Sequence, residues 1–335
     1  MSAAGSSRPS GTWRWGIAGT GAIAGQFSRD LAHVDGAVVT AVGSRSADTA
    51  QAFAHEHGIA HEHGSYEALA DDPDVDIVYV ASPHPWHAEH TLLFLAAGKH
   101  VLCEKPMAMS AAEVGTMVDA ARRADRFLME ALWCRFLPAY DELRFLLERG
   151  VVGEPQVVQA DLGYVAAPDP TSRLFDPVLG GGATLDLGIY PVQLGHLVFG
   201  PPDDIVATGH LAATGVDDHL AASLRHAGGG LTSITTSFRA SLRSRATVVG
   251  TKGTLELAPI VHRASQVVVR DVGGRTVVEA PITGVGLHHQ ATEVQRCLAA
   301  GERESPVVPL DESLAMATTL DAILDRLGVR YPPRG

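Results

Sequence analysis

Between residues 13 and 130 the chain alternates short apolar runs with longer amphipathic segments. An apolar run bounded by turn residues is typical of a buried parallel strand, and the amphipathic segment after it is typical of a crossover helix. The pattern therefore predicts βαβ units and an α/β fold with a doubly wound parallel sheet. The predicted strands are Trp13–Ala18, Val38–Gly43, Asp76–Ala81, His100–Cys103 and Phe127–Met129, and the predicted helices are Ala22–Val34, Thr49–His57, Trp86–Ala97 and Ala111–Ala124.

The pattern changes after a predicted helix at Pro138–Arg149. From residue 155 onward, polar and apolar residues alternate with period two, and glycine-rich turns such as Gly250–Gly253 separate the runs. This predicts an α+β domain with an open, mainly antiparallel sheet, which packs one face on helices and often pairs the other with a second subunit. The predicted strands are Gln156–Leu162, Leu220–His226, Leu231–Arg239, Ala246–Val249, Thr254–Leu257, Val267–Asp271 and Arg275–Glu279, and the further helices are Asp186–Phe199, His289–Ala300 and Asp311–Arg326.

Composition excludes several classes of partner. A formal net charge of −12 argues against binding to nucleic acid or to an anionic membrane surface. The three cysteines, Cys103, Cys134 and Cys297, form no C-x-x-C pair, which argues against a disulfide framework or a zinc motif. No apolar run approaches the length of a membrane span. These features predict a cytoplasmic protein with reduced thiols.

A glycine-rich turn follows the first predicted strand and opens the first predicted helix. In the sequence Gly19-Thr20-Gly21-Ala22-Ile23-Ala24, Gly19 permits a tight turn and Gly21 lets the backbone approach a pyrophosphate. The small Ala24 allows the helix and strand to pack closely. In this strand–turn–helix context the motif predicts dinucleotide binding, with Ala22 and Ile23 at the start of the helix as further contacts.

The end of the second predicted strand indicates which dinucleotide is bound. An NAD site usually carries Asp or Glu about 20 residues after the turn, where it accepts hydrogen bonds from the ribose. Here the strand ends in Ser44-Arg45-Ser46, without a carboxylate. Arg45 suits a 2′-phosphate and both serines can donate to it, so the sequence favours NADP, with NAD possible. The alternative is an ordinary loop arginine.

These features define the expected domains. Residues 12–135 are predicted to form the dinucleotide-binding Rossmann domain, and residues 136–330 the substrate and dimerisation domain. The Ser/Ala/Gly-rich residues 1–11 are predicted to be a disordered leader, and residues 331–335 a coil tail. The expected partners are a small-molecule substrate and further copies of the chain, as a homodimer or dimer of dimers through the C-terminal sheet.

Two further predicted strands end in chemically active side chains. The strand Asp76–Ala81 leads into the loop Ser82–His87, and the strand His100–Cys103 leads into Glu104 and Lys105. Only three of the 26 basic residues are lysines, yet one of them, Lys105, directly follows the strand His100–Cys103. Lysine differs from arginine in that it can lose its proton, so this position suggests proton chemistry rather than charge alone. Since ligands of doubly wound sheets bind beyond the carboxyl ends of the strands, we expect this edge to border the nicotinamide. Its expected cofactor contacts are Ser82, His84, His87 and Glu104. His84 and His87 could also contact the substrate, cap a helix or position the loop, and the positioning role is favoured.

A third motif is the triple glycine Gly180–Gly182, which leads into the helix at Asp186–Phe199. A glycine run at a helix start suggests that the backbone closely approaches another group. Asp186 and Tyr190 are four residues apart and therefore share a helix face. Such a pair is structurally common, so its significance depends on the motifs around it.

Taken together, these motifs make the chain similar to the glucose–fructose oxidoreductase and inositol dehydrogenase superfamily. Within it the chain most resembles the dimeric dihydrodiol dehydrogenase and NADP-dependent D-xylose dehydrogenase branch. The resemblance covers nearly the whole chain. It rests on Gly19-x-Gly21, Ser44-Arg45-Ser46, Glu104–Ala108, Met129–Phe136, Gly180–Tyr190 and Gly250–Gly253.

The resemblance implies a catalytic role for Lys105 and an acid/base role for the Tyr190 hydroxyl. Many relatives have His where this chain has Tyr190, which supports the branch assignment. Tyrosine titrates near pH 10 and must fall by about two to three units, or roughly 3–4 kcal/mol, to act as a base near neutrality. One ammonium at about 4 Å supplies about that much at an effective dielectric constant near 20. We therefore expect Lys105 to lower the pKa of Tyr190 without a metal.

The remaining site residues are predicted from their neighbourhood in these motifs. Asp186 is expected to orient Lys105 or a substrate hydroxyl, and Trp133, Arg135 and Phe175 are candidates to line the substrate pocket, although each could simply be a packing residue. The histidine-rich segment His55–His63 departs from the family pattern, and its spacing matches no standard metal-ligand set. The sequence therefore predicts no metal site.

Three functions remain open at this point. The first is an NADP-dependent oxidoreductase acting on a sugar or a trans-dihydrodiol. The second is a hydrolase or lyase that uses a tightly bound nicotinamide without net redox change. The third, a non-catalytic NADP sensor, is disfavoured because a sensor has no need of Lys105, Asp186 and Tyr190. The sequence does not name the substrate.

Overall fold

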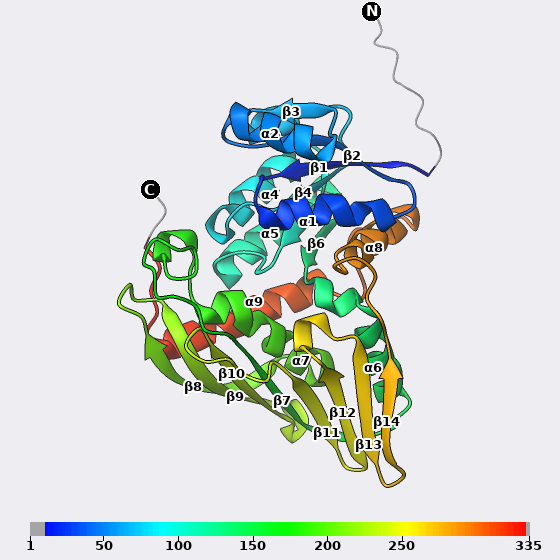
Figure 1. The fold of residues 1–335 in the computed structure, drawn as a ribbon, viewed down its shortest axis with the longest axis vertical. Helices are drawn as coiled ribbons and strands as arrows, with labels where there is room; N and C mark the ends of the chain where they lie inside the picture. The colour runs from blue at the N-terminus through cyan, green and yellow to red at the C-terminus, as the bar shows by residue number, and fades with distance from the viewer. Residues whose placement is uncertain (1–10, 333–335) are drawn as a thin grey trace, which may run out of the picture.

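The computed structural model describes residues 11–332 and places two sheets one above the other (Figure 1). The predicted leader, residues 1–11, therefore lies outside the described residues except for Gly11, and the predicted tail lies outside them from residue 333 onward. Tyr331, at the start of that tail, packs against the body of the protein, where its hydroxyl donates to the carbonyl of Gly181 at 2.7 Å.

The N-terminal part is a six-stranded parallel sheet with helices on both faces, as predicted. Its strand order is β3-β2-β1-β4-β5-β6, so the chain reverses direction across the sheet between β1 and β4. Its strands are β1 (Trp13–Ala18), β2 (Ala37–Gly43), β3 (His61–His63), β4 (Ile77–Val80), β5 (His100–Glu104) and β6 (Leu128–Ala131). Its helices are α1 (Ala22–Asp30), α2 (Ala47–His57), α3 (Tyr66–Ala70), α4 (His87–Ala96) and α5 (Ala111–Ala124).

The central strands are buried on both faces, which explains their continuous apolar sequences. All four residues of β4 are buried, and the ring of Tyr79 on this strand stacks on Phe27 of α1 with centroids 3.9 Å apart. The Tyr79 hydroxyl donates to Glu104 at the end of β5, with an oxygen–oxygen distance of 2.5 Å. The core thereby fixes the carboxyl end of β5.

The C-terminal part is an eight-stranded sheet in the order β14-β13-β12-β11-β7-β10-β9-β8. It is antiparallel except where β10 runs parallel to β7, so the predicted α+β architecture is confirmed. Strand β8 was not predicted. The strands are β7 (Pro155–Gly163), β8 (Pro202–Leu211), β9 (Asp217–His226), β10 (Leu231–Ser237), β11 (Ala246–Gly250), β12 (Gly253–Ala258), β13 (Gln266–Asp271) and β14 (Gly274–Glu279).

Four further helices follow along the chain: α6 (Pro138–Glu148), α7 (Ile189–Phe199), α8 (His288–Ala299) and α9 (Leu310–Leu327). Helix α8 packs against the Rossmann part, where the amide of His288 donates to Asp30 of α1 at 2.9 Å (Figure 1). Helix α9 lies between the two sheets (Figure 1) and also contacts the Rossmann part, since Asp321 accepts a hydrogen bond from the amide of Ala111 at 2.8 Å. On the strands of the eight-stranded sheet, Val206 and Leu231 are exposed.

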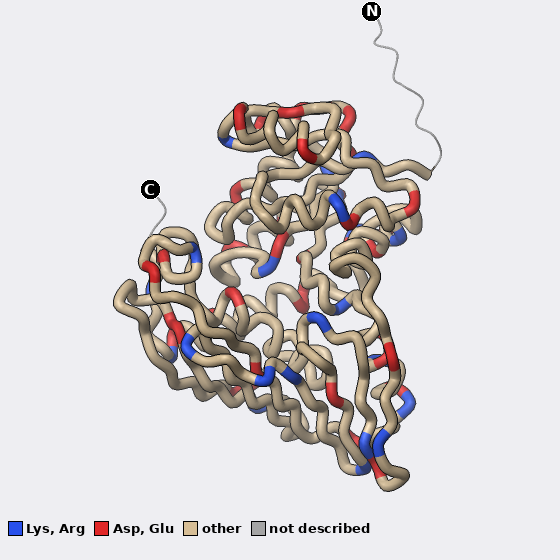
Figure 2. The backbone as a smooth tube through the Cα atoms, in the orientation of Figure 1, with Lys and Arg blue, Asp and Glu red and all other residues tan. Residues whose placement is uncertain are grey.

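Charged residues of both signs are interspersed along both parts of the chain, as the red and blue segments of Figure 2 show. Several of them pair across distant segments at the surface, for example Arg303 with Asp125 at 2.8 Å.

Within residues 11–332, none of the helices combines the length and the apolar character that crossing a bilayer requires.

Arg135 joins the two parts of the molecule. Its guanidinium is buried and pairs with both carboxylate oxygens of Glu312 at 3.0 and 3.2 Å. It also donates to the carbonyls of Gln193 and Val307 at 3.1 and 3.0 Å. These four contacts bind Arg135 to α7, to α9 and to the segment before α9. Its guanidinium therefore holds segments of the protein together and is not directed at a ligand.

We expect Arg135→Ala to lower the free energy of unfolding by about 3 kcal/mol, because it leaves Glu312 and two carbonyls without their buried partner. Urea denaturation measures this. The control is Arg225→Ala, which removes an exposed ion pair to Asp203 and should cost less than about 1 kcal/mol. Unfolding of Arg135→Ala at the wild-type urea concentration would contradict the structural role.

Candidate active site

A cavity of about 790 Å³ extends from the turn after β1 to the start of α7. Its volume is within the range of small-molecule and cofactor sites. It brings together most of the residues that the sequence analysis selected: Gly19, Gly21, Ala22, Ile23, Ser44, Arg45, Ser82, His84, His87, Glu104, Lys105, Trp133, Asp186 and Tyr190.

The glycine-rich turn has the geometry that a pyrophosphate site needs. Gly19 has φ +117°, and a Cβ there would lie 2.9 Å from the carbonyl oxygen of Ala81. A Cβ on Gly21 would meet no protein atom within 4 Å, so the backbone is open to the cavity at this point. Gly21 is also the N-cap of α1, whose first turn has no acidic residue, and its free N–H groups favour an anion. The turn therefore fits a dinucleotide.

Arg45 lies at the same end of the cavity, immediately after β2. Its guanidinium is 5.6 Å from the ring centroid of Trp86, a cation–π contact that orients the side chain. The Ser44 hydroxyl also lines the cavity and hydrogen-bonds Thr49 at 2.7 Å. Ser46 instead caps α2, where its side chain accepts from the amide of Thr49, and it is not among the described residues that line the cavity.

The loop after β4 is fixed to the loop after β5 through His87. The two ring nitrogens of His87 face the carbonyl oxygens of Ser82 and Pro106, at 2.7 and 2.9 Å. Both of its polar atoms are thereby engaged by backbone, so His87 positions the loop that carries Ser82 and His84. The ring of His84 has a buried Nδ1 without a hydrogen-bond partner. Burial, His87 and Lys105 lower the pKa of His84 to about 3, so its imidazole is neutral.

Lys105 reaches across the cavity from β5 to the turn that precedes α7. Its ammonium donates to the backbone carbonyl of Asp186 at 2.8 Å and lies 3.5 Å from the Asp186 carboxylate. Burial alone would lower the pKa of Lys105, but the charges of Tyr190, Asp186 and Glu104 outweigh it and raise that pKa. Burial opposes ionisation of Asp186, yet Lys105 and Arg173 bring its pKa down to about 2. Both groups are therefore charged at neutral pH.

The Tyr190 hydroxyl accepts a hydrogen bond from the indole N–H of Trp133 at 3.1 Å. The Lys105 ammonium lies 4.8 Å from the centroid of the Tyr190 ring. The expectation of a lowered tyrosine pKa is wrong for this structure. Burial raises the pKa of Tyr190 to about 12, because it outweighs the opposing effects of Lys105 and of the Trp133 hydrogen bond. Tyr190 therefore keeps its proton at neutral pH.

His262 is a site residue that the sequence analysis missed. Its ring lies 4.7 Å from the ring of Tyr190, centroid to centroid, and it lines the cavity with a buried, unpartnered Nδ1. Burial and then Lys105 lower its pKa to about 3, so it is neutral. It comes from the short helical turn Val261–Arg263 after β12, where a lone histidine among loop residues gives no sequence signal.

The structure does not bring two predicted substrate residues to the cavity. Arg135 is engaged by Glu312 as described above, and Phe175 is buried against Phe238 with ring centroids 5.8 Å apart. Neither is among the described residues that line the cavity. Arg173, which was not predicted, occupies the substrate end instead and pairs with Asp186 at 3.3 Å.

The comparison with known families agrees with this geometry. Residues 13–132 match an oxidoreductase family with an NAD-binding Rossmann fold, and residues 140–256 match the GFO/IDH/MocA C-terminal domain. The chain belongs to the GFO/IDH/MocA oxidoreductase family. The predicted superfamily and an NAD(P)-dependent dehydrogenase are thereby confirmed.

Individual members of the GFO/IDH/MocA family are similar along almost the whole chain. Trans-1,2-dihydrobenzene-1,2-diol dehydrogenase of Xenopus laevis is 38% identical over 332 residues, covering 95% of this chain and 99% of the relative. Aldose-aldose oxidoreductase from Caulobacter crescentus, solved with glycerol, is 25% identical with a TM-score of 0.86 and coverages of 94% and 97%. A 3-ketoreductase from Actinomadura kijaniata, solved with NADP and TDP-benzene, is 26% identical with a TM-score of 0.84 and coverages of 94% and 98%.

We expect Gly21→Val to weaken binding of a nicotinamide dinucleotide by about tenfold or more, because its side chain would occupy the space that a pyrophosphate needs. Calorimetric titration measures the affinity, and the melting temperature should stay close to that of the wild type. The control is Gly115→Val on α5, where a Cβ makes only an ordinary contact to Leu314 and where we expect unchanged affinity. Equal affinities in both variants would contradict this location for the dinucleotide.

Proposed function

We propose that this GFO/IDH/MocA family member is an NADP-dependent dehydrogenase that moves a hydride between nicotinamide and a CH–OH carbon of a trans-dihydrodiol or a sugar. The observation that carries the proposal is the position of Lys105, Asp186 and Tyr190, which line the same cavity as the glycine-rich turn. A hydride transfer to or from an alcohol carbon needs a dinucleotide and a proton-transfer group within one site.

The lining of the substrate end supports an alcohol with more than one hydroxyl group. His84 and His262 line the cavity near Tyr190, and imidazole rings and a tyrosine hydroxyl are groups that hydrogen-bond hydroxyls. A substrate with several hydroxyls suits such a lining. The indole of Trp133 adds an apolar surface that suits a ring. The names of the similar proteins, which act on a dihydrodiol or an aldose, support the same substrate class.

The direction of the hydrogen bond between Trp133 and Tyr190 determines what the tyrosine can do. An indole N–H only donates, so the Tyr190 oxygen accepts there and its own O–H is directed elsewhere. That O–H is free to hydrogen-bond a substrate oxygen. Nicotinamide, when bound, supplies the hydride donor or acceptor. In carbonyl reduction Tyr190 donates its proton to the substrate oxygen as negative charge develops there.

Lys105 stabilises the charge that this proton transfer creates. Its ammonium lies against the Tyr190 ring and is held by Asp186, so it does not need to reorganise during the reaction. In the oxidation direction the same ammonium favours the tyrosinate that must form before a substrate proton is accepted. Because burial raises the pKa of Tyr190 to about 12, that form is scarce at neutral pH.

The proposal predicts that only the oxidation direction depends on pH near neutrality. The protonated Tyr190 is fully populated below its pKa, so reduction should be flat from about pH 6 to 9, whereas oxidation should rise by up to about tenfold per pH unit. Nicotinamide absorbance measures the reduction and oxidation rates with NADP(H) and trans-dihydrodiols or aldoses.

Tyr190→Phe and Lys105→Met should each lose about 10²–10⁴-fold in kcat while keeping coenzyme affinity.

Two results of this assay would contradict the proposal. One is an oxidation rate that stays high in Tyr190→Phe. The other is no absorbance change with any alcohol, together with nicotinamide released on denaturation, which would indicate a redox-neutral hydrolase or lyase.

The coenzyme preference has its own test. Arg45→Leu should raise the KM for NADP⁺ by about tenfold or more and change that for NAD⁺ by less than about threefold, because only NADP carries the phosphate that a guanidinium pairs with. Arg29→Leu is the matched control, since Arg29 lies on α1 with an exposed side chain. Equal changes for both coenzymes in Arg45→Leu would show that Arg45 does not distinguish them.

A further inference from the structure

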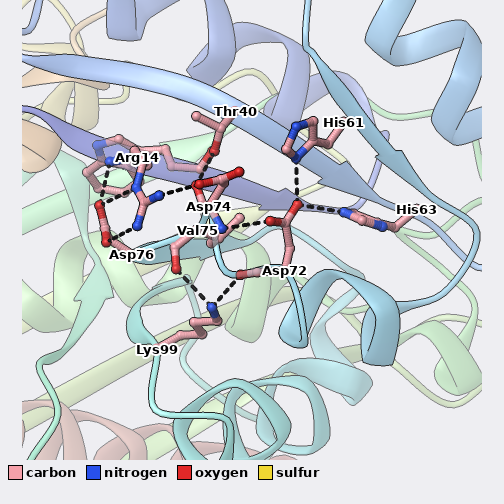
Figure 3. Close-up of polar contacts among 10 residues, drawn as sticks. Arg14, Thr40, His61, His63, Asp72, Asp74, Val75, Asp76 and Lys99 are labelled. Atoms are coloured by element: carbon pink, nitrogen blue, oxygen red, sulfur yellow. Dashed lines mark hydrogen bonds and ion pairs between the residues drawn. The ribbon is translucent and has the colours of Figure 1, made fainter. Parts of the chain in front are cut away.

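A second cluster of polar side chains lies outside the residues that line the cavity. It joins the edge strand β3 to the loop between α3 and β4 (Figure 3). His61 and His63 are two residues apart on β3, so both side chains project from the same face of the strand. Asp72 comes from the loop after α3 and lies between them, as Figure 3 shows.

The three side chains present their donor atoms to one point. Asp72 Oδ2 lies 2.8 Å from Nδ1 of His61 and 2.9 Å from Nε2 of His63. One donor atom from each residue falls within 4.8 Å of the other two. Two imidazole nitrogens and one carboxylate oxygen are a donor set that zinc binds in proteins, with a fourth position left for water.

The carboxylate of Asp72 is held in place by the backbone. It is almost fully buried, and its other oxygen, Oδ1, accepts from the amide of Asp74 at 2.8 Å. Lys99 donates to the carbonyls of Asp72 and Val75 at 2.6 and 2.9 Å, which fixes the loop (Figure 3). Supporting contacts of this kind orient a ligand before a metal binds.

The charge on Asp72 distinguishes this cluster from an ordinary surface ion pair. Arg14 pairs with the neighbouring Asp74 and Asp76 at 2.6 and 2.9 Å. Among residues 11–332, however, Asp72 forms ion-pair contacts only with the two histidines, and the ammonium of Lys99 is directed at backbone carbonyls. A buried carboxylate is stabilised by a paired positive charge, and a cation held between the two imidazoles would supply one at Oδ2.

We propose that His61 Nδ1, His63 Nε2 and Asp72 Oδ2 form a binding site for a divalent cation of the zinc type. Tetrahedral geometry at zinc–ligand distances near 2.0 Å separates ligand atoms by about 3.3 Å, so each distance from Asp72 to a ring nitrogen needs to open by about half an ångström. The cation replaces the hydrogens that now lie between the rings and the carboxylate. The side chain of His61 is 41% exposed, which leaves a path for the ion and a position for water.

The histidine spacing alone predicts no such site, because the third donor is nine residues beyond His63 and depends on the fold of α3.

A bound cation ties β3 to the loop that leads into β4. The carbonyl of His63 accepts from the amide of Ser44 at 3.0 Å, so the site also braces the segment that carries Arg45. The cation is structural in this arrangement and takes no part in hydride transfer.

Calorimetric titration of chelator-treated full-length protein with Zn²⁺ tests the site directly. The wild type should bind one equivalent and gain melting temperature, and Co²⁺ should give the visible absorption of a tetrahedral complex. The double variant His61→Gln/His63→Gln should bind at least tenfold more weakly and lose the Co²⁺ absorption. Asp72→Asn, which can keep one hydrogen bond to a ring nitrogen, should weaken binding in the same direction.

His210→Gln is the matched control. His210 faces Asp218 at 2.9 Å on the C-terminal sheet, whereas the neighbouring His219 is hydrogen-bonded to Ser237, so the loss of His210 should leave zinc binding unchanged. Wild-type affinity in the double variant would overturn the proposal, as would equal losses in the control. Nicotinamide turnover is not needed for either readout, so failure here does not bear on the dehydrogenase assignment.

Discussion

The contact between Lys105 and Asp186 is the constraint on which the site depends. Lys105 directly follows strand β5 of the parallel sheet. Asp186 lies in the π-helical turn Thr184–Gly188, which directly precedes α7 in the C-terminal part. Both side chains are only 12% exposed, so an ammonium left unpaired there would be destabilised by its loss of hydration. The pair therefore sets the position of α7 relative to β5, and it is this placement that brings Tyr190 on α7 against the ammonium.

Much of this arrangement could be predicted because it is encoded locally. Strand β1 and helix α5 have the predicted limits, since period and capping residues are properties of a short window. Lys105, Asp186 and Tyr190 were selected individually from strand ends and a glycine-rich turn. The rule that ligands of doubly wound sheets bind beyond the carboxyl ends of the strands accounts for Lys105. The grouping of Asp186 and Tyr190 with it came from the family resemblance. The oligomeric state stays a prediction.

What could not be predicted depends on contacts between distant segments. Strand β3 has three residues and α3 has five, too few for a period to be seen. His262 has no neighbours in sequence that indicate chemistry, and it reaches Tyr190 only because a turn after β12 returns to the cavity. The lowered pKa expected for Tyr190 failed for a related reason. It weighed one ammonium at about 4 Å, while burial by the whole surrounding core acts in the opposite direction and is larger.

The buried charges show why the fold, and not the residue type, decides which polar groups act. Arg135 is a conspicuous arginine beside Trp133, yet Glu312 and two carbonyls engage both of its terminal nitrogens, so it stabilises the fold. Lys105 is also paired, but its partner is held to one side and its other neighbour, Tyr190, faces the cavity. Asp72 differs from both, because its ion-pair contacts among residues 11–332 are with imidazoles. The partners of Arg135 hold its guanidinium inside the protein, whereas Lys105 lines the cavity and Asp72 is flanked by the partly exposed His61.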